Sequence, residues 1–266
     1  NLKNNKQNKT KKNAMSYRGG NNNSQATYKR MLNDMRSNNP SVKLSGLESI
    51  AETIAFSDPL TLRNFPIQEA CKEFVKIIQH SNDMQILALS SQCIVNLLDS
   101  CPESAKHLMN FNYIQIVKEK MDYEISKNVI ENLVHSLCAL TKTKAKAVGQ
   151  VFGIKFILKN LDAMNGAERH YAVSSLSNFT SYFCTPKFGA SLPTIAGYFS
   201  SNDDQIVSNM ITTFTNIMNS VNFSDIPIET IETLCVSLSI INNSKTIIQI
   251  LELLLYLANS KPFAEM

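Results

Sequence analysis

The chain has 266 residues, 44% of them hydrophobic and 18% charged, so it can bury a substantial core in one large domain or two ordinary ones. Its formal net charge of +4 does not make it a uniformly basic protein of the nucleic-acid-binding kind, because residues 1–30 hold eight Lys and Arg and no acidic residue. The 18 basic and 22 acidic residues that follow give residues 31–266 a net charge of −4.

The first 26 residues are rich in Asn and Lys, as in NLKNNKQNK and GGNNNS, and hold few apolar side chains. Such a segment buries too little apolar surface to offset the entropy of ordering. We therefore expect residues 1–26 to be a disordered tail and residues 27–266 to form the folded domain. The basic tail has the composition of a solvated spacer or of a nucleic-acid-binding arm, and we expect no nucleic-acid contact from the folded part.

From about residue 41 onward, apolar residues recur with the spacing of amphipathic helices, and the alternation typical of strands is absent. Pro66 and Pro227 suit the first turn of a helix, and Asp83, Asp203 and Ser244 suit N-caps. The predicted helices are 41–57, 66–80, 83–100, 111–121, 125–142, 153–161, 166–183, 189–199, 203–221, 226–240 and 245–259.

The stretch TLRNFPIQEACKEFVKIIQ, residues 61–79, holds a short apolar hook, a proline and an amphipathic helix. We expect the hook LRNF to pack down after the first helix of the unit and Pro66 to begin a return helix. Residues 104–121, SAKHLMNFNYIQIVKEKM, repeat this arrangement without the proline.

Segments of the chain align with one another when Asn96, Ala139, Asn178, Asn216 and Tyr256 are superposed. Glu52 occupies the equivalent place in an earlier copy, and the successive spacings are 44, 43, 39, 38 and 40 residues. A period near 40 with two or three helices per unit is typical of armadillo and HEAT repeats. We predict an all-α armadillo/HEAT-type superhelix, a right-handed solenoid of about five to six repeats with the last one incomplete.

Each reference position has an apolar residue two positions before it and one position after it, such as Leu176 and Phe179 around Asn178. We expect these residues to form the core. The reference positions themselves, with the residues one turn away, then form a polar stripe on the opposite side of the helix. The candidate partner-binding residues on this concave face are Gln92, Asn96, His135, Ser174, Asn178, Thr212 and Asn216.

Two interpretations of the stripe stay open. Asn side chains at intervals of about 40 residues can pair with the backbone of an extended peptide, which would make the stripe a binding surface. A polar stripe is also the solvated side of any amphipathic helix. Importin-alpha-type adaptors place Trp four residues before the Asn, whereas this chain has no Trp, and cargo of that type is not expected.

No catalytic residue, metal site or cofactor is predicted. The six Cys are scattered without a CxxC pair, the four His fall in different units, and there is no Gly-rich phosphate loop. His135 and Cys138 lie one turn apart, but no third group is placed to orient a base. The most apolar run, 247–258, is too short to cross a bilayer. We expect a monomer in the cytoplasm, the nucleus or both, without membrane contact.

Four stretches, in order, resemble the N-terminal armadillo domain of HECT-type ubiquitin ligases of the ubiquitin-fusion-degradation and thyroid-receptor-interacting family. They are PLTLRNFPIQEACKEFVKIIQ, NDMQILALSSQCIVNLLDSCPESAKHLM, AVGQVFGIKFILKNL and ERHYAVSSLSNFTSYFCTPKFGASLPTIAGYF. The resemblance covers roughly residues 28–260. It implies a module that recruits ubiquitin or a ubiquitinated or degron-bearing substrate, while a separate HECT domain supplies catalysis.

Neither that HECT domain nor its catalytic cysteine is found in the chain. Because the chain begins with Asn and KPFAEM opens a segment without its helix, we expect a part of a longer protein. The alternative functions are a generic armadillo protein-interaction scaffold and a nuclear transport adaptor.

Overall fold

A computed structural model describes residues 21–56, 61–123, 125–223 and 226–259, and all regular structure in these ranges is helical. The α-helices are α2 (Asn21–Met35), α3 (Pro40–Phe56), α4 (Ile67–His80), α5 (Met84–Ser100), α6 (Ser104–Asn110), α7 (Tyr113–Met121), α8 (Lys127–Leu161), α9 (Ala167–Thr180), α10 (Leu192–Gly197), α11 (Asp204–Met218), α12 (Ile228–Ile240) and α13 (Ser244–Ala258). The 3-10 helices η2 (Thr61–Asn64), η3 (Pro186–Ser191) and η4 (Tyr198–Ser200) lie between them.

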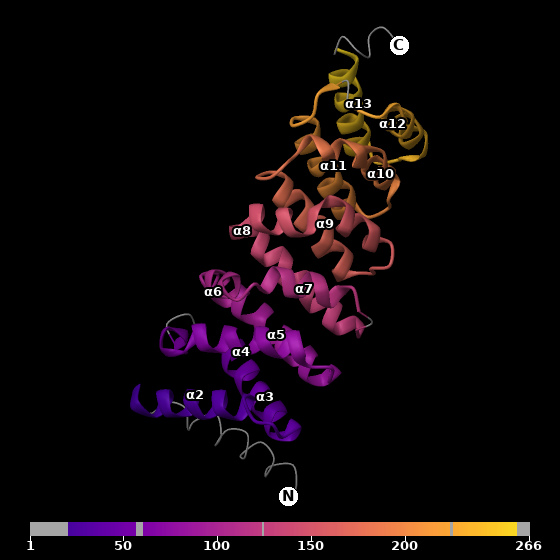
Figure 1. Ribbon diagram of the computed structural model, residues 1–266. Helices are drawn as coiled ribbons and strands as arrows, with labels where there is room; N and C mark the ends of the chain where they lie inside the picture. The colour runs from indigo at the N-terminus through magenta and orange to yellow at the C-terminus, as the bar shows by residue number, and fades with distance from the viewer. Residues whose placement is uncertain (1–20, 57–60, 124, 224–225, 260–266) are drawn as a thin grey trace, which may run out of the picture.

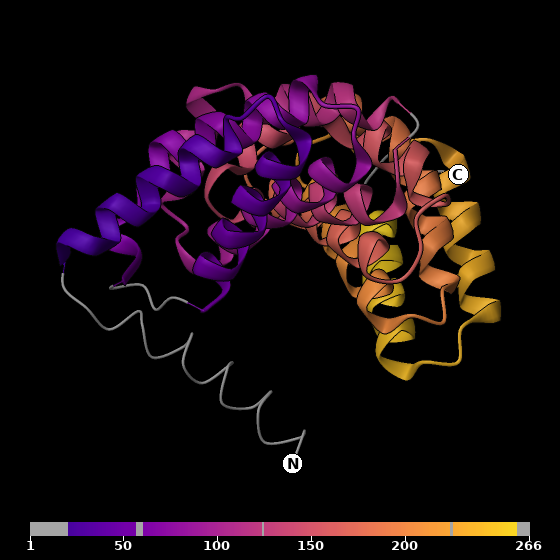
Figure 2. The same cartoon turned by 90° about the horizontal axis from the view of Figure 1, so that it is seen from below.

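The helices stack along one axis, with α2 and α13 at opposite ends of the molecule (Figure 1). The longest helix of each repeat contacts that of the next repeat, in the order α3, α5, α8, α9, α11 and α13. A second layer is made by contacts of α4 with α7 and of α10 with α12. Seen from below, the stack is an arch, with the yellow α13 on its inner side and the gold α12 on its outer side (Figure 2). This is the predicted all-α solenoid.

The long helix α8 is three helices joined end to end. Lys144 (φ −130°, ψ 30°) and Gly153 (φ 63°, ψ 171°) leave helical geometry inside it. The positive φ of Gly153 is one that L side chains rarely adopt. The first segment ends the third repeat and the other two begin the fourth. The sequence predicted helices over 125–142 and 153–161 but missed the short one between them.

The hook at 61–65 packs as predicted. Leu62 and Phe65 are buried at 1% and 4% exposure, and the Phe65 ring meets Tyr28 of α2 edge-on at 5.4 Å between centroids. Pro66 is the N-cap of α4 rather than a residue of its first turn. Pro227 is likewise the N-cap of α12, whereas the sequence placed it in the first turn of that helix.

The predicted core register is confirmed. Leu176 and Phe179 are fully buried, as are the equivalents of Leu176 two repeats earlier, Ile94, and one repeat later, Phe214. Leu254 of the last repeat is only partly buried. The close approach of neighbouring helices is visible at Gly149 of α8, where a Cβ would lie 2.8 Å from the Phe179 ring of α9.

Two of the three predicted caps are correct. Asp83 accepts hydrogen bonds from the backbone N–H groups of Gln85 and Ile86, and Asp203 does the same for Gln205 and Ile206. The prediction of Ser244 is wrong, because the cap of α13 is the preceding residue, Asn243. Asn243 accepts from the N–H groups at 245 and 246.

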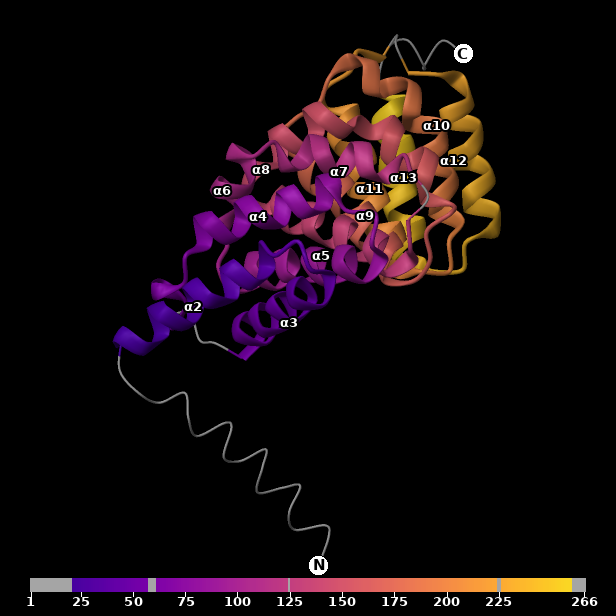
Figure 3. The same cartoon turned by 60° about the horizontal axis from the view of Figure 1, so that its bottom comes forward.

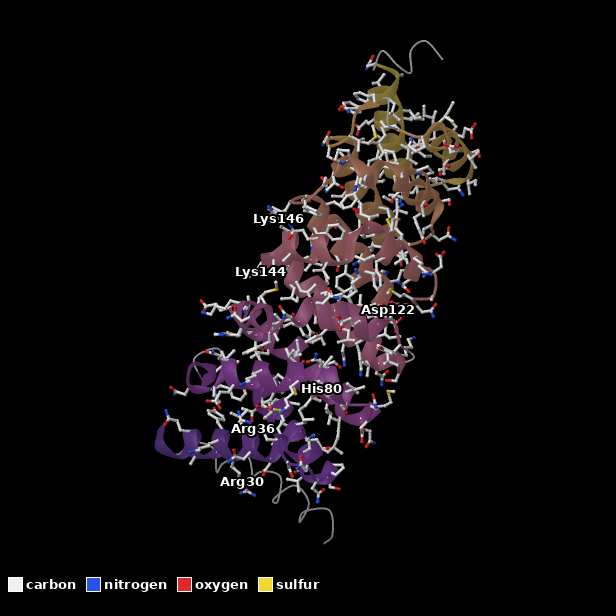
Figure 4. All side chains as sticks on the ribbon, in the orientation of Figure 1. Arg30, Arg36, His80, Asp122, Lys144 and Lys146 are labelled. Atoms are coloured by element: carbon white, nitrogen blue, oxygen red, sulfur yellow. The ribbon has the colours of Figure 1, made fainter. Side chains whose placement is uncertain are left out.

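The N-terminal helix α2 was not predicted. It begins at Asn21, so the expected boundary of the tail at residue 26 falls inside this helix, while residues 1–20 of that tail lie outside the described part of the chain. Tyr28, Met31 and Leu32 of α2 are buried against the first repeat. At the end of α2, Arg36 forms ion pairs with Glu73 (2.9 Å) and Glu69 (3.2 Å) of α4 (Figure 4).

Candidate functional site

The candidate surface is the polar stripe along α5, α8, α9 and α11, here called the inner stripe. Figure 3 shows these helices following one another between α3 and α13. Of its predicted members, Thr212 is exposed and the others are half-buried. The inner stripe consists of Gln92, Asn96, His135, Ser174, Asn178, Thr212 and Asn216.

Asn side chains of the inner stripe join neighbouring repeats. The Asn178 side-chain amide donates to the hydroxyl of Thr141 on α8 at 3.0 Å. The Asn216 amide of α11 donates to Thr180 Oγ1 (3.1 Å) and Ser181 Oγ (3.0 Å) at the end of α9. Each bond contributes about 0.5–1.5 kcal/mol net. The Asn side chains therefore fix the register between repeats with their N–H groups.

The first part of the stripe is paired within its own helix. Gln92 Nε2 donates to Asn96 Oδ1 at 2.8 Å, one turn along α5. Thr212 is also locally bonded, donating to the backbone carbonyl of Ser208 at 3.0 Å. These contacts leave the helix surface accessible and do not cross to another repeat.

His135 lies at the centre of a three-helix cluster. Its ring is stacked on Tyr171 of α9, with centroids 4.0 Å apart and planes 4° from parallel. Its Nε2 lies 3.5 Å from Asp99 Oδ2 of α5. Burial lowers the pKa of His135, against the opposing attraction of Asp99. The histidine thus presents a neutral, planar surface with a carboxylate beside it.

The pair His135 and Cys138 has the wrong electrostatics for nucleophilic catalysis. Cys138 is 8% exposed, and burial raises the pKa of its thiol. A protonated thiol is a weak nucleophile, and a histidine with a lowered pKa supplies no cation to favour the thiolate. Cys138 packs as a small core residue.

The sequence argument missed a second row of residues on the same side. Asn132, Tyr171 and Asn209 lie seven residues, or two turns, before three reference positions. Asn132 donates to Ser91 Oγ of α5 at 3.1 Å, and Asn209 accepts from Ser177 of α9 at 2.6 Å. The two-turn spacing is visible in the sequence and identifies this row once the reference positions are aligned.

The charge on the inner side differs between its two halves. Glu48 and Glu52 of α3 occupy the equivalents of Gln92 and Asn96 and are exposed, and Asp99 is 46% exposed. The stripe residues of α9 and α11 are hydroxyl and amide groups. The exposed carboxylates on this side therefore lie at α3 and α5, and again at Glu252 of α13, which is the equivalent of Gln92.

The described residues offer no enclosed site for a small substrate in this region. The void beside Val134, Phe152 and Met164 has a volume of about 10 Å³, which is roughly that of one water probe. Within the described ranges, no three His, Cys, Asp or Glu side chains are placed to hold a metal ion. No helix among these residues has the length and apolarity to cross a membrane.

Comparison with known proteins finds a curated relative and many similar folds. No protein-family model matches the chain. The E3 ubiquitin-protein ligase UPL4 of Arabidopsis thaliana is 22% identical over 197 residues, which cover 73% of this chain and 13% of that protein. The chain therefore spans a small part of that relative.

Solved structures identify the fold. Computationally designed armadillo repeat proteins for modular peptide recognition superpose with a TM-score of 0.70 at 14% identity, over 85% of this chain and 97% of theirs. A designed armadillo repeat protein in complex with the peptide (KR)4 superposes with a TM-score of 0.67 at 14% identity, over 86% and 98%. With the repeat geometry, these superpositions show that the described residues form an armadillo-type α-solenoid.

Proposed function

We propose that this solenoid is the substrate-recognition module of a HECT-type ubiquitin ligase, working in the cytoplasm or nucleus, and that its inner stripe binds ubiquitin or a degron-bearing segment of the substrate. The observation that carries the proposal is the similarity of 73% of the chain to a ubiquitin ligase, combined with the row of polar side chains that makes up the inner stripe. The described residues supply the recognition surface, and the transfer chemistry is assigned to another domain.

The chemistry of the inner stripe supports a protein ligand in an extended conformation. Side-chain carbonyl and hydroxyl groups recur once per repeat along the inner stripe. An extended chain presents backbone hydrogen-bonding groups at regular intervals, and these can pair with the side chains of the stripe. The exposed carboxylates of Glu48, Glu52 and Asp99 favour a basic residue near the α3–α5 end. A designed armadillo protein of the same fold carries a peptide of Lys and Arg, which is the same kind of ligand.

The proposal is tested by titrating labelled ubiquitin chains and a linear ubiquitin fusion against the protein. The blocking variant is Ser174→Arg with Thr212→Arg, because these two side chains lie on the inner stripe without bonds to another repeat. The matched control is Gln68→Arg with Gln79→Arg, which adds the same charge at exposed sites on α4. We expect the blocking variant to weaken binding at least tenfold and the control to leave it unchanged.

The alternative is a general armadillo scaffold or transport adaptor without a link to ubiquitin. Absence of binding to any ubiquitin probe would exclude the ubiquitin role and leave this alternative. Unchanged binding by the blocking variant would instead show that binding occurs outside the inner stripe, and equal loss in both variants would show a general effect of the added charge. Asn178→Ala with Asn216→Ala is less suitable as a test, since it also removes bonds between repeats.

A further inference from the structure

Positive charge is concentrated in the middle of the array. Residues 132–161 hold five Lys and no Asp or Glu, whereas residues 31–266 as a whole have a net charge of −4. The stretches before and after are acidic, with 9 basic against 13 acidic residues in 31–131 and 2 against 7 in 203–266. The lysines of the middle region are therefore a local feature and do not reflect a general basicity of the domain.

Three of these lysines surround the break in α8 at Lys144. Lys142, Lys144 and Lys146 lie within five successive residues, and Lys144 and Lys146 lie at the same edge of the molecule (Figure 4). Lys142 and Lys146 are exposed, and Lys144 is half-buried. In the part of the chain that the structure describes, none of the three forms an ion pair. Their positive charges are thus available to a partner.

Local helix stability does not account for lysines at this place. Lys144 and Lys146 stand at the start of the segment 145–152, where the helix dipole disfavours positive charge. Elsewhere in the array Asp83 and Asp203 occupy helix starts, as the dipole favours. Natural proteins keep such violations of local preference mainly at functional sites.

A tyrosine and a fourth lysine of the next repeat lie beside the same part of α8. Tyr182 is 75% exposed at the end of α9. Its neighbour Phe183 packs against α8, where a Cβ at Gly149, one turn after Lys146, would lie 2.8 Å from the Phe183 ring. The exposed Lys187 belongs to η3, which also contacts α8. We call the following residues the basic edge: Lys142, Lys144, Lys146, Tyr182 and Lys187.

The equivalent positions of the preceding repeat have the opposite charge. Asp99 and Glu103 are the equivalents of Lys142 and Lys146, and both are exposed. A nucleic-acid strand has a phosphate at every nucleotide, so a strand that continued from the basic edge along the array would meet these carboxylates. A short protein segment can confine its acidic residues to the lysines. The charge pattern thus favours an acidic protein segment over nucleic acid.

We propose that the basic edge binds a short acidic segment of a partner protein, with Asp or Glu side chains facing the lysines and an apolar side chain against Tyr182. The lysines supply charge complementarity, which raises the association rate and excludes basic partners. Tyr182 supplies the contact area that tyrosine provides at protein interfaces. Lys142 borders the inner stripe on α8, whereas the other four residues lie beyond the helical segments that carry the stripe. The proposal does not depend on ubiquitin binding.

The test uses two fluorescently labelled peptides of about 10 residues, roughly 33 Å long when extended. One carries Asp and Glu around a central Leu, and its twin carries Asn and Gln at the same positions. Fluorescence anisotropy follows the titration with the full chain at about 0.15 M salt, where distant charges are screened. We expect the acidic peptide to bind at least tenfold more tightly than its neutral twin.

The charge-reversed variant is Lys144→Glu with Lys146→Glu. Glutamate is favoured at a helix start, so the fold is retained. The matched control is Lys155→Glu with Lys159→Glu, which makes the same change in net charge at exposed positions further along α8. We expect the charge-reversed variant to lose at least tenfold in affinity for the acidic peptide and the control to stay within twofold of the parent protein.

Tyr182→Ala separates docking from attraction between opposite charges, because it leaves the lysines in place. We expect it to weaken binding of the acidic peptide at least threefold without changing the salt dependence of binding. The matched control is Tyr123→Ala, at a 71% exposed site beyond α7, which leaves binding unchanged. Equal affinity of Tyr182→Ala and the parent protein would overturn the apolar contact.

The proposal fails if the acidic and neutral peptides bind alike or if neither binds. It also fails if the charge-reversed variant binds as the parent does, since the peptide then lies elsewhere, such as on the basic residues 1–30 that every variant retains. Equal losses in that variant and its control would show attraction to net charge alone. An oligonucleotide of matched length that binds more tightly than the acidic peptide, and loses affinity in the same variant, would assign the basic edge to nucleic acid instead. Circular dichroism of each variant confirms that the helices are intact.

Discussion

At the residue scale, two of the three Asn side chains of the inner stripe connect repeats rather than projecting freely. The amides of Asn178 and Asn216 donate to hydroxyl groups of the preceding long helix, as does the amide of Asn132. The sequence predicted that Asn178 and Asn216 lie on the side of the helix opposite the core, and both are half-buried. It did not show these bonds, because the bonds depend on how closely neighbouring helices approach.

Leu176 tests the core register most simply, because it has no exposed surface. Replacing it with Ala leaves a cavity among packed side chains, and we expect Leu176→Ala to lower the free energy of unfolding by about 2–5 kcal/mol. Urea denaturation followed by circular dichroism measures the change. Thr212→Ala, at an exposed site, is the control with little effect, and a loss below about 0.5 kcal/mol for Leu176→Ala would contradict the register.

His135 provides a pH test. Burial lowers its pKa in the folded protein below the unfolded value of about 6.5. In the interval between the two values the unfolded chain binds more protons, so this residue makes stability fall as the pH drops below about 6.5. An NMR titration, with His135→Gln to assign the ring signal, should give a midpoint below 6.5. A midpoint above 6.5 would mean that the attraction of Asp99 outweighs burial.

At the element scale, helix starts that depend on local chemistry were predictable. Asp83 and Asp203 could be identified as caps because an N-cap bond reaches only two or three residues along the chain. The misplacement of the α13 cap by one residue has the same origin, since Asn243 and Ser244 are both good capping residues. The sequence also placed the two breaks of α8 within two residues, at the end of 125–142 and at the start of 153–161, but it missed the short helical segment between Lys144 and Gly153.

The Asp203 cap is stabilised by a second partner. His170 Nε2 lies 2.6 Å from Asp203 Oδ2, and this hydrogen bond lowers the pKa of the carboxyl group, with backbone N–H groups of α11 adding to the effect. We expect Asp203→Ala to cost about 0.5–2 kcal/mol at neutral pH. Because the folded pKa is the lower one, the stabilisation is complete above about pH 4 and is lost as the pH falls through the folded value.

Thermal or urea denaturation at several pH values measures the difference between Asp203→Ala and the parent protein. The neighbouring exposed residue gives the control, Asn202→Ala, for which we expect little change at any pH. A difference that stays constant from neutral pH down to pH 2 would show that the carboxylate charge does not contribute to the cap.

At the scale of the whole molecule, the solenoid could be predicted because each repeat has the same apolar pattern and the pattern recurs about every 40 residues. The ends are less predictable, since a terminal helix has a partner on one side only. Helix α2 was missed because its sequence, NNNSQATYKRMLNDM, is polar on average and its apolar residues Met31, Leu32 and Met35 acquire meaning only against the first repeat.

The central claim is that the inner side of the arch binds the protein ligand, and site-specific photo-crosslinking tests it most directly. A benzoylphenylalanine placed at Gln92, Ser174 or Thr212 samples the inner stripe, and one placed at Gln68 or Gln79 samples α4. With a ubiquitin fusion as the ligand, we predict crosslinks from the three inner positions at a yield at least ten times that from α4. Equal yields, or crosslinks from α4 alone, would contradict the claim.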